Sequence, residues 1–253
     1  MLLIESLARH GTFLFRWRSF LPLLLLPLVV PALVETVAVE ETIGEAAEEV
    51  WTIACLAISF AGLAIRWATV GFVPAGTSGR NTREQRADAL NTTGTYSVVR
   101  NPLYFGNFIA ILGLVVAIKS WWFVLVVCLA YWLYIERIIA AEESFLADAH
   151  AAAFADYVSR TPAFIPNFSL WTSPANSFSM RTVLRREYNG VLSVSAAYVA
   201  LEFVTDVLME RESVRAWMES DWWWLVVGAL AVAVFAVLRG LKKRTRILHV
   251  PGR

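Results

Sequence analysis

The first stretch of the sequence that could bind a ligand begins at a glycine and ends inside an apolar run. Residues 94–106 read Gly-Thr-Tyr-Ser-Val-Val-Arg-Asn-Pro-Leu-Tyr-Phe-Gly. Asn101 is a favourable N-cap residue and Pro102 has no N–H group to leave unsatisfied, so this pair predicts the start of a helix. The N–H groups of a helix start can bind an anionic or polar ligand group. The residues equally suit a capped membrane helix with Arg100 at the lipid interface, and the stretch alone leaves both interpretations open.

The second stretch holds two adjacent carboxylates, Glu142 and Glu143, just after an apolar run. The dipole of a helix that ends there disfavours acidic residues, an objection that weakens if the helix continues past the membrane. Carboxylates close to apolar surface require a cationic partner. The candidates are Arg100, Arg137 and a bound cation such as a sulfonium or an amine. A solvated helix face is the alternative.

Long apolar runs must position these residues. The chain has 253 residues, of which 58% are hydrophobic and 17% charged, and about 20 apolar residues suffice to cross a bilayer. Six runs qualify: Phe20–Val39, Val50–Val73, Pro102–Ile118, Trp121–Ala141, Tyr188–Leu208 and Trp222–Leu238. We therefore expect an all-α, polytopic integral membrane protein with about six spans, forming a single membrane domain over residues 1–253. Only Lys119 and Ser120 join the third run to the fourth, which predicts a tight antiparallel helical hairpin.

Basic residues predict the orientation of the spans. Lys and Arg gather before the first run, between the second and third, between the fourth and fifth, and after the sixth. These segments contain Arg9, Arg16, Arg18, Arg80, Arg83, Arg86, Arg100, Arg160, Arg181, Arg185, Arg186, Lys242, Lys243, Arg244 and Arg246. Six alternating spans bring all four segments to one side, which the positive-inside rule assigns to the cytoplasm. We expect both termini there, with the cell inner membrane as the location.

Taken together, the two stretches resemble motifs of the isoprenylcysteine carboxyl methyltransferase and phospholipid methyltransferase superfamily. Residues 96–106 are similar to its Arg-His-Pro-x-Tyr-x-Gly motif, and residues 142–166 to its Glu-Glu segment. The chain departs at Asn101, where the family has His, at Phe154, where it has Tyr, and at Arg137, which precedes the Glu pair by one position more. The resemblance predicts a methyltransferase core over residues 50–168 and two further C-terminal spans over residues 188–238.

The resemblance implies a site for S-adenosyl-L-methionine at the cytoplasmic face, between the loop before the third span and the segment after the fourth. The implied cofactor-binding residues are Leu90, Asn91, Tyr96, Asn101, Pro102, Tyr104, Gly106, Glu142, Glu143 and Tyr157. The implied catalytic residues are Glu143, Arg137 and Arg100, with Arg137 as the candidate for contact with the acceptor.

The expected function is methyl transfer to a lipid or other hydrophobic acceptor that enters from the bilayer, with membrane lipids as partners and no nucleic acid. One alternative is a sterol-reductase-like, NADPH-dependent membrane oxidoreductase, and another is a non-catalytic membrane protein. Cofactor binding separates these classes. The three histidines match no metal-ligand spacing, so no metal site is predicted, and Cys55 and Cys128 lie within apolar runs as small hydrophobic residues.

Overall fold

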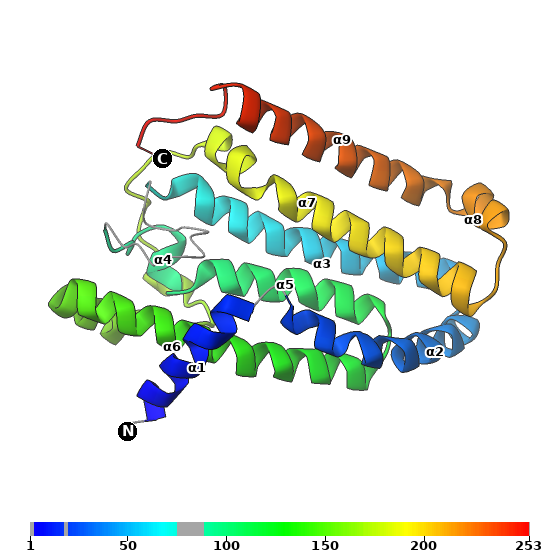
Figure 1. Cartoon of the computed structure of the whole chain (residues 1–253), viewed down its shortest axis with the longest axis horizontal. Coiled ribbons are helices and arrows are strands. Elements are labelled where there is room, and N and C mark those ends of the chain that lie inside the picture. Colours follow the sequence, from blue (N-terminus) through cyan, green and yellow to red (C-terminus); the bar gives the residue numbers. More distant parts are fainter. Residues whose placement is uncertain (1–2, 18–19, 75–88, 253) are drawn as a thin grey trace.

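A computed structural model describes residues 3–17, 20–74 and 89–252, and these residues form helices without a strand. The long helices run side by side, with the short helices and linkers at their ends (Figure 1). In chain order the elements are α1 (Leu3–Trp17), η1 (Leu21–Leu25), α2 (Leu26–Ile43), α3 (Glu45–Phe72), α4 (Thr95–Val98), α5 (Pro102–Ala117), α6 (Trp121–Arg160), η2 (Phe168–Leu170), α7 (Met180–Phe203), η3 (Val204–Met209), α8 (Val214–Ser220) and α9 (Trp222–Arg244).

Helix lengths confirm the prediction of an all-α polytopic membrane protein. Five helical segments are long and apolar enough to cross a bilayer: Leu21–Ile43, Glu45–Phe72, Trp121–Arg160, Met180–Met209 and Trp222–Arg244. The third predicted span is helix α5, which has 16 residues and a length of about 24 Å. It is shorter than the hydrocarbon core of about 30 Å, so its ends lie within or close to the membrane.

Helix α6 continues past the apolar run that ends at Ala141 and runs from Trp121 to Arg160, the alternative that the sequence left open. The added segment, residues 142–160, is rich in Ala, the residue with the highest helix propensity. The helical path is broken at Ala151, where φ is 18° and ψ is −96°, and residues 121–150 before this break span about 45 Å, longer than the hydrocarbon thickness of about 30 Å. The carboxylate pair lies within the helical part before Ala151 and not at the end of the apolar run's helix, so the objection based on the helix dipole weakens.

Small residues bring α3 and α5 together. A Cβ atom on Gly62 of α3 would lie 2.4 Å from the backbone nitrogen of Ala110 on α5. One on Gly113 would lie 2.3 Å from the Ser59 hydroxyl. Helices in membranes associate through such close backbone contacts. The packing fixes α5, and with it the helix start at Pro102, against α3.

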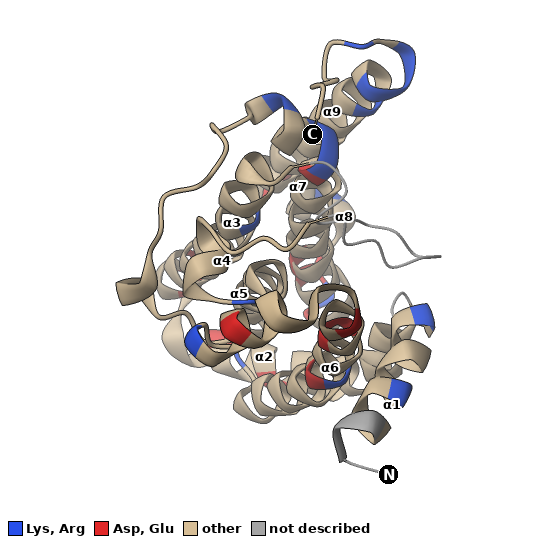
Figure 2. Cartoon of the chain, turned by 90° about the vertical axis from the view of Figure 1, so that its left-hand side faces the viewer, with Lys and Arg blue, Asp and Glu red and all other residues tan. Residues whose placement is uncertain are grey.

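Both ends of the chain lie at the same end of the bundle, together with α4 (Figure 1). Figure 2 looks onto this end and shows Lys and Arg on α1 and at the end of α9, where Lys242, Lys243 and Arg244 form the last turn. This arrangement agrees with the predicted placement of the termini on one side, while its assignment to the cytoplasm stays a prediction. Arg18, Arg80, Arg83 and Arg86 lie outside the described residues.

Candidate functional site

The helix start at Asn101 is held by contacts with the segment that follows α6. Asn101 is the N-cap residue of α5, but its side chain accepts no capping hydrogen bond. Its amide instead donates to the carbonyl of Ala163 at 3.0 Å and to Oε1 of Glu143 at 3.5 Å. The side chain predicted to cap the helix therefore connects the two polar stretches.

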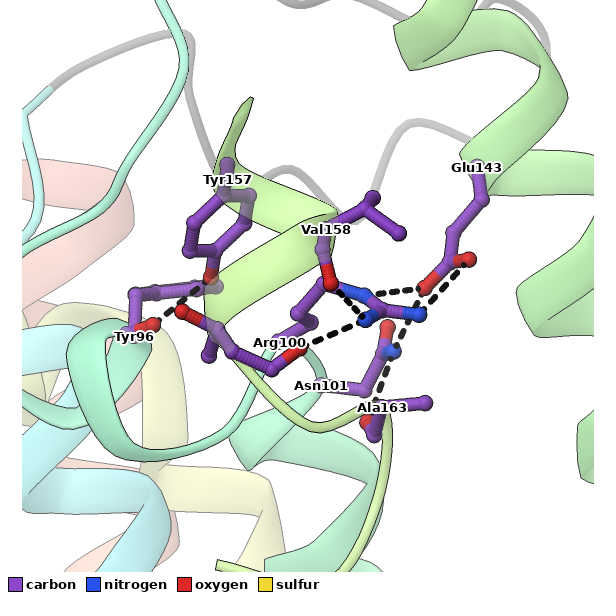
Figure 3. Close-up of polar contacts among 8 residues, drawn as sticks. Tyr96, Arg100, Asn101, Glu143, Tyr157, Val158 and Ala163 are labelled. Atoms are coloured by element: carbon purple, nitrogen blue, oxygen red, sulfur yellow. Dashed lines mark hydrogen bonds and ion pairs between the residues drawn. The ribbon is translucent and has the colours of Figure 1, made fainter. Parts of the chain in front are cut away.

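Arg100 and Glu143 form the centre of the site (Figure 3). Two parallel bonds join them, Nε to Oε1 at 2.8 Å and Nη2 to Oε2 at 3.1 Å. Nη1 donates to the carbonyls of Thr161 at 2.6 Å and Val158 at 3.4 Å. Bidentate guanidinium–carboxylate pairs are among the stronger charged hydrogen bonds. One arginine thus joins the loop before α5 to α6 and to the linker after it.

The neighbouring carboxylate faces the first turns of α5. The hydroxyl of Tyr104 donates to Oε1 of Glu142 at 2.7 Å, and the hydroxyl of Tyr131 donates to the carbonyl of Tyr104 at 2.7 Å. Glu142 lies 21 residues, or about 32 Å, beyond the start of α6. Since this matches the thickness of the hydrocarbon core, we expect the carboxylate pair close to a membrane surface.

Tyr157 holds the loop that carries Tyr96. Its ring is 5% exposed, and its hydroxyl donates to the Tyr96 carbonyl at 2.7 Å. The adjacent loop begins at Gly94, whose φ of 63° is in the left-handed region that favours glycine. A Cβ atom there would lie 3.2 Å from Cγ of Pro174, so the loop also packs on the linker after α6.

A cavity of about 270 Å³ lies beside this loop. Its walls come from the end of α3, the loop before α4 and the α6–α7 linker. The lining residues are Thr69, Phe72, Val73, Pro74, Ala89, Leu90, Asn91, Thr92, Thr93, Thr95, Tyr96, Ala175 and Asn176. Three of the residues predicted to bind the cofactor, Leu90, Asn91 and Tyr96, line it. Phe72 and Asn176 were not predicted, because no local motif marks them and only the fold brings them here.

The remaining predicted residues lie elsewhere. Pro102 is buried at the start of α5. Gly106 faces α3, where an added Cβ would lie 2.8 Å from Cγ of Arg66. Arg137 contacts Glu136 at 2.7 Å and the Leu133 carbonyl within its own helix. The contacts described for Arg137 do not include the Arg100–Glu143 pair, and its role toward an acceptor stays a prediction.

A second bidentate pair, which the sequence did not predict, lies deeper in the bundle. Arg66 of α3 donates to both carboxylate oxygens of Glu187 on α7, at 2.9 and 3.0 Å. It also donates to Oδ1 of Asn107 at 2.8 Å and to the carbonyl of Leu103 at 3.3 Å, both on α5. The glutamate side chain is 4% exposed. This network joins the first of the two C-terminal spans to the helices that carry the site.

Comparisons with known proteins agree with the motifs. Residues 51–153 match the sequence model of the phospholipid methyltransferase family, which confirms the resemblance to this superfamily predicted above. The cobalt-zinc-cadmium resistance protein CzcN of Cupriavidus metallidurans is 36% identical over 133 residues, covering 50% of this chain and 56% of that protein. The nickel-cobalt-cadmium resistance protein NccN of Alcaligenes xylosoxydans xylosoxydans is 36% identical over 128 residues, covering 50% and 57%. The chain thus aligns with little more than half the length of these relatives. No solved structure matches it significantly.

Proposed function

Residues 51–153 carry the phospholipid methyltransferase family match, and from this premise we propose that the chain transfers a methyl group from S-adenosylmethionine to a hydrophobic acceptor at the cytoplasmic membrane surface. One observation carries the proposal. The helix start at Asn101 and the carboxylates of α6 meet within hydrogen-bonding distance, through Arg100–Glu143 at 2.8 Å and Tyr104–Glu142 at 2.7 Å.

The chemistry of the site fits the proposed cofactor. The described residues that line the cavity include Phe72 and Tyr96 together with hydroxyl and amide side chains, and they include no Asp, Glu, Lys or Arg. Aromatic rings and neutral polar groups suit a nucleoside. The carboxylates of Glu142 and Glu143 are outside the cavity lining, and their negative charge suits the cationic part of the cofactor.

The residues of the chain then have separate tasks. When bound, S-adenosylmethionine supplies an electrophilic methyl group. Arg100 and Asn101 hold the loop and the linker in place, so that positioning supplies much of the acceleration. A carboxylate acceptor needs no base, whereas an amine or thiol acceptor must lose a proton, which Glu142 can accept. The location of Glu142 at the membrane surface lets an acceptor reach it from the bilayer.

Binding of S-adenosylhomocysteine to the purified full-length chain tests the proposal. We expect calorimetry to show binding of S-adenosylhomocysteine and none of NADPH, and tritium from labelled S-adenosylmethionine to enter a total lipid extract. Asn101→Ala and Glu143→Ala should each weaken S-adenosylhomocysteine binding about tenfold or more, the size expected for removing a hydrogen bond to a charged group. A wild-type chain that binds NADPH instead favours the oxidoreductase alternative. Unchanged binding of S-adenosylhomocysteine by both variants contradicts the proposed position of the cofactor.

The names of the two relatives support a setting in resistance to divalent metal ions, and we propose that methyl transfer by this chain contributes to such resistance. Host cells that express the wild-type chain and cells that express Glu143→Ala can be compared for growth in cobalt, zinc and cadmium. Higher tolerance with the wild type alone supports the link. Equal tolerance of the two kinds of cells contradicts a role of the Arg100–Glu143 site in metal resistance.

A further inference from the structure

The linker between α6 and α7 lies beyond the segment that matches the methyltransferase family, which ends at residue 153, yet it runs along the candidate cofactor site. The backbone N–H of Gly94 donates to the Thr172 carbonyl at 2.9 Å, and the N–H of Thr172 donates to the Ser97 hydroxyl at 2.9 Å. The N–H of Ala175 donates to the Thr93 hydroxyl at 3.3 Å. Successive bonds of this kind fix the linker against the loop before α4.

The far end of the linker is fixed to α3. The N–H of Ser179 donates to the Gly71 carbonyl at 2.9 Å. The ring of Phe178 packs edge-on against Phe72, with centroids 5.2 Å apart. Asn176, between these contacts, donates from Nδ2 to the carbonyl of Phe72 at 3.3 Å and lines the cavity. Its position is therefore determined by α3 and by the start of α7.

We propose that Asn176 binds the adenine base of the cofactor, an inference that rests on the proposed methyltransferase function. A carboxamide offers two donors and one acceptor, and the bond to Phe72 uses one donor. The remaining donor and acceptor match the N7 acceptor and the N6 amino donor of adenine, the pairing that asparagine makes with this base in nucleic acids. Phe72 and Tyr96, which line the same cavity, supply aromatic surface for the ring.

The described residues of the cavity lining include no Asp, Glu, Lys or Arg, which supports the assignment to the uncharged end of the cofactor. Among the described lining residues the polar groups are hydroxyls and amides, whereas Glu142 and Glu143 lie outside the cavity lining. The part of the chain that follows the family match, beyond residue 153, thereby contributes to cofactor binding. Its helix α7 is anchored by Glu187 to Arg66 and holds the linker that closes the base-binding end of the site.

Two ligands and three variants test this inference in the full-length chain. Calorimetry is carried out with S-adenosylhomocysteine and with 5′-deoxy-5′-methylthioadenosine, which lacks the amino-acid end. Asn176→Ala should weaken the binding of both ligands by the same factor, about ten- to a hundredfold for the loss of a bidentate contact to a base. Ala175→Leu keeps the backbone bond to Thr93 but adds bulk to the cavity wall, and should also weaken both.

Asn167→Ala is the matched control, because this linker asparagine is outside the cavity lining and bonds Ser169 at 3.1 and 2.7 Å; its binding should equal that of the wild type. A wild-type chain that binds neither ligand refutes the proposed function itself. Wild-type binding with both cavity variants within twofold refutes the role of the linker and leaves the methyltransferase proposal intact. Loss of S-adenosylhomocysteine binding by Asn176→Ala without loss of methylthioadenosine binding moves Asn176 to the amino-acid end and overturns the adenine assignment.

Discussion

Two arginine–glutamate pairs of the same geometry flank the first turns of α5, and they differ in what surrounds them. In both pairs the guanidinium is 12% exposed and makes two bonds to the carboxylate. Glu187, the partner of Arg66, is 4% exposed between three helices. Glu143, the partner of Arg100, is 21% exposed at the end of the bundle.

The difference in exposure predicts a structural role for the Arg66–Glu187 pair and a binding role for the Arg100–Glu143 pair. A buried ion pair stabilises a fold only while both charges are present, because either charge alone has lost its hydration. A partly exposed carboxylate keeps access to water and can exchange its partner for a ligand. We therefore expect the Arg66–Glu187 pair to control stability and the Arg100–Glu143 pair to control binding.

The largest expected effect on stability follows removal of the Glu187 carboxylate. Glu187→Ala leaves the Arg66 guanidinium buried without its counter-charge, which lowers the free energy of unfolding by about 3–5 kcal/mol. Denaturant titration in detergent, followed by circular dichroism, measures this loss. Glu219→Ala, in an exposed pair with Arg215, is the control and should change little. A loss below about 1 kcal/mol for Glu187→Ala contradicts the structural role.

A smaller loss of stability is expected when Gly106, which packs against the Arg66 side chain, is replaced. The Cβ of Gly106→Ala would lie 2.8 Å from both Cγ of Arg66 and the carbonyl of Gly62, and overpacking of this kind costs about 1–3 kcal/mol. The same denaturation assay applies. Gly240→Ala has no atom within 4 Å of the new Cβ, so it should retain wild-type stability. Equal stability of the two variants shows that Gly106 is not needed for packing.

The Arg100–Glu143 pair should show the opposite pattern, with a large effect on binding and a small effect on stability. Arg100→Lys keeps the charge but loses the bidentate geometry, so S-adenosylhomocysteine binding should weaken about tenfold while the free energy of unfolding falls by less than in Glu187→Ala. Arg160→Lys, in an exposed pair with Asp156, serves as control in both assays. If Arg100→Lys destabilises the chain as strongly as Glu187→Ala, the distinction between the two pairs is lost.

The smallest effect concerns a third charged cluster, around Lys119 in the turn between α5 and α6, which should change stability only at high pH. Burial lowers the pKa of Lys119, but Glu40 at 2.7 Å and Glu48 at 3.1 Å outweigh it, so the pKa lies above the usual 10.5. A raised lysine pKa stabilises the fold fully below the unfolded value and loses this contribution as pH rises through the folded value. Thermal unfolding midpoints should therefore be flat from pH 7 to 9 and fall above about pH 10.5. Lys119→Met should weaken that fall, and an identical fall in the variant contradicts the assignment.

Much of the site could be predicted because its signals are local. Arg100 and Asn101 stand at a recognisable helix start, and Glu142 and Glu143 follow an apolar run, so composition and motif spacing identify both stretches. The end of the apolar run at Ala141 left open whether the helix continues, and the structure extends it to Arg160 with a break at Ala151. Helix formation depends on backbone hydrogen bonds and residue propensity, both of which continue outside the membrane.

The sequence by itself determined the class of protein and the two stretches that form the site, because membrane spans and capping motifs depend on neighbouring residues. Only the tertiary structure decided which distant groups meet them. Glu187 reaches Arg66 across 121 positions, and Asn176 reaches the carbonyl of Phe72 across 104. Contacts of this kind follow from the close packing of α3, α5 and α7, where small residues set the distance between helices, and no local pattern encodes that distance.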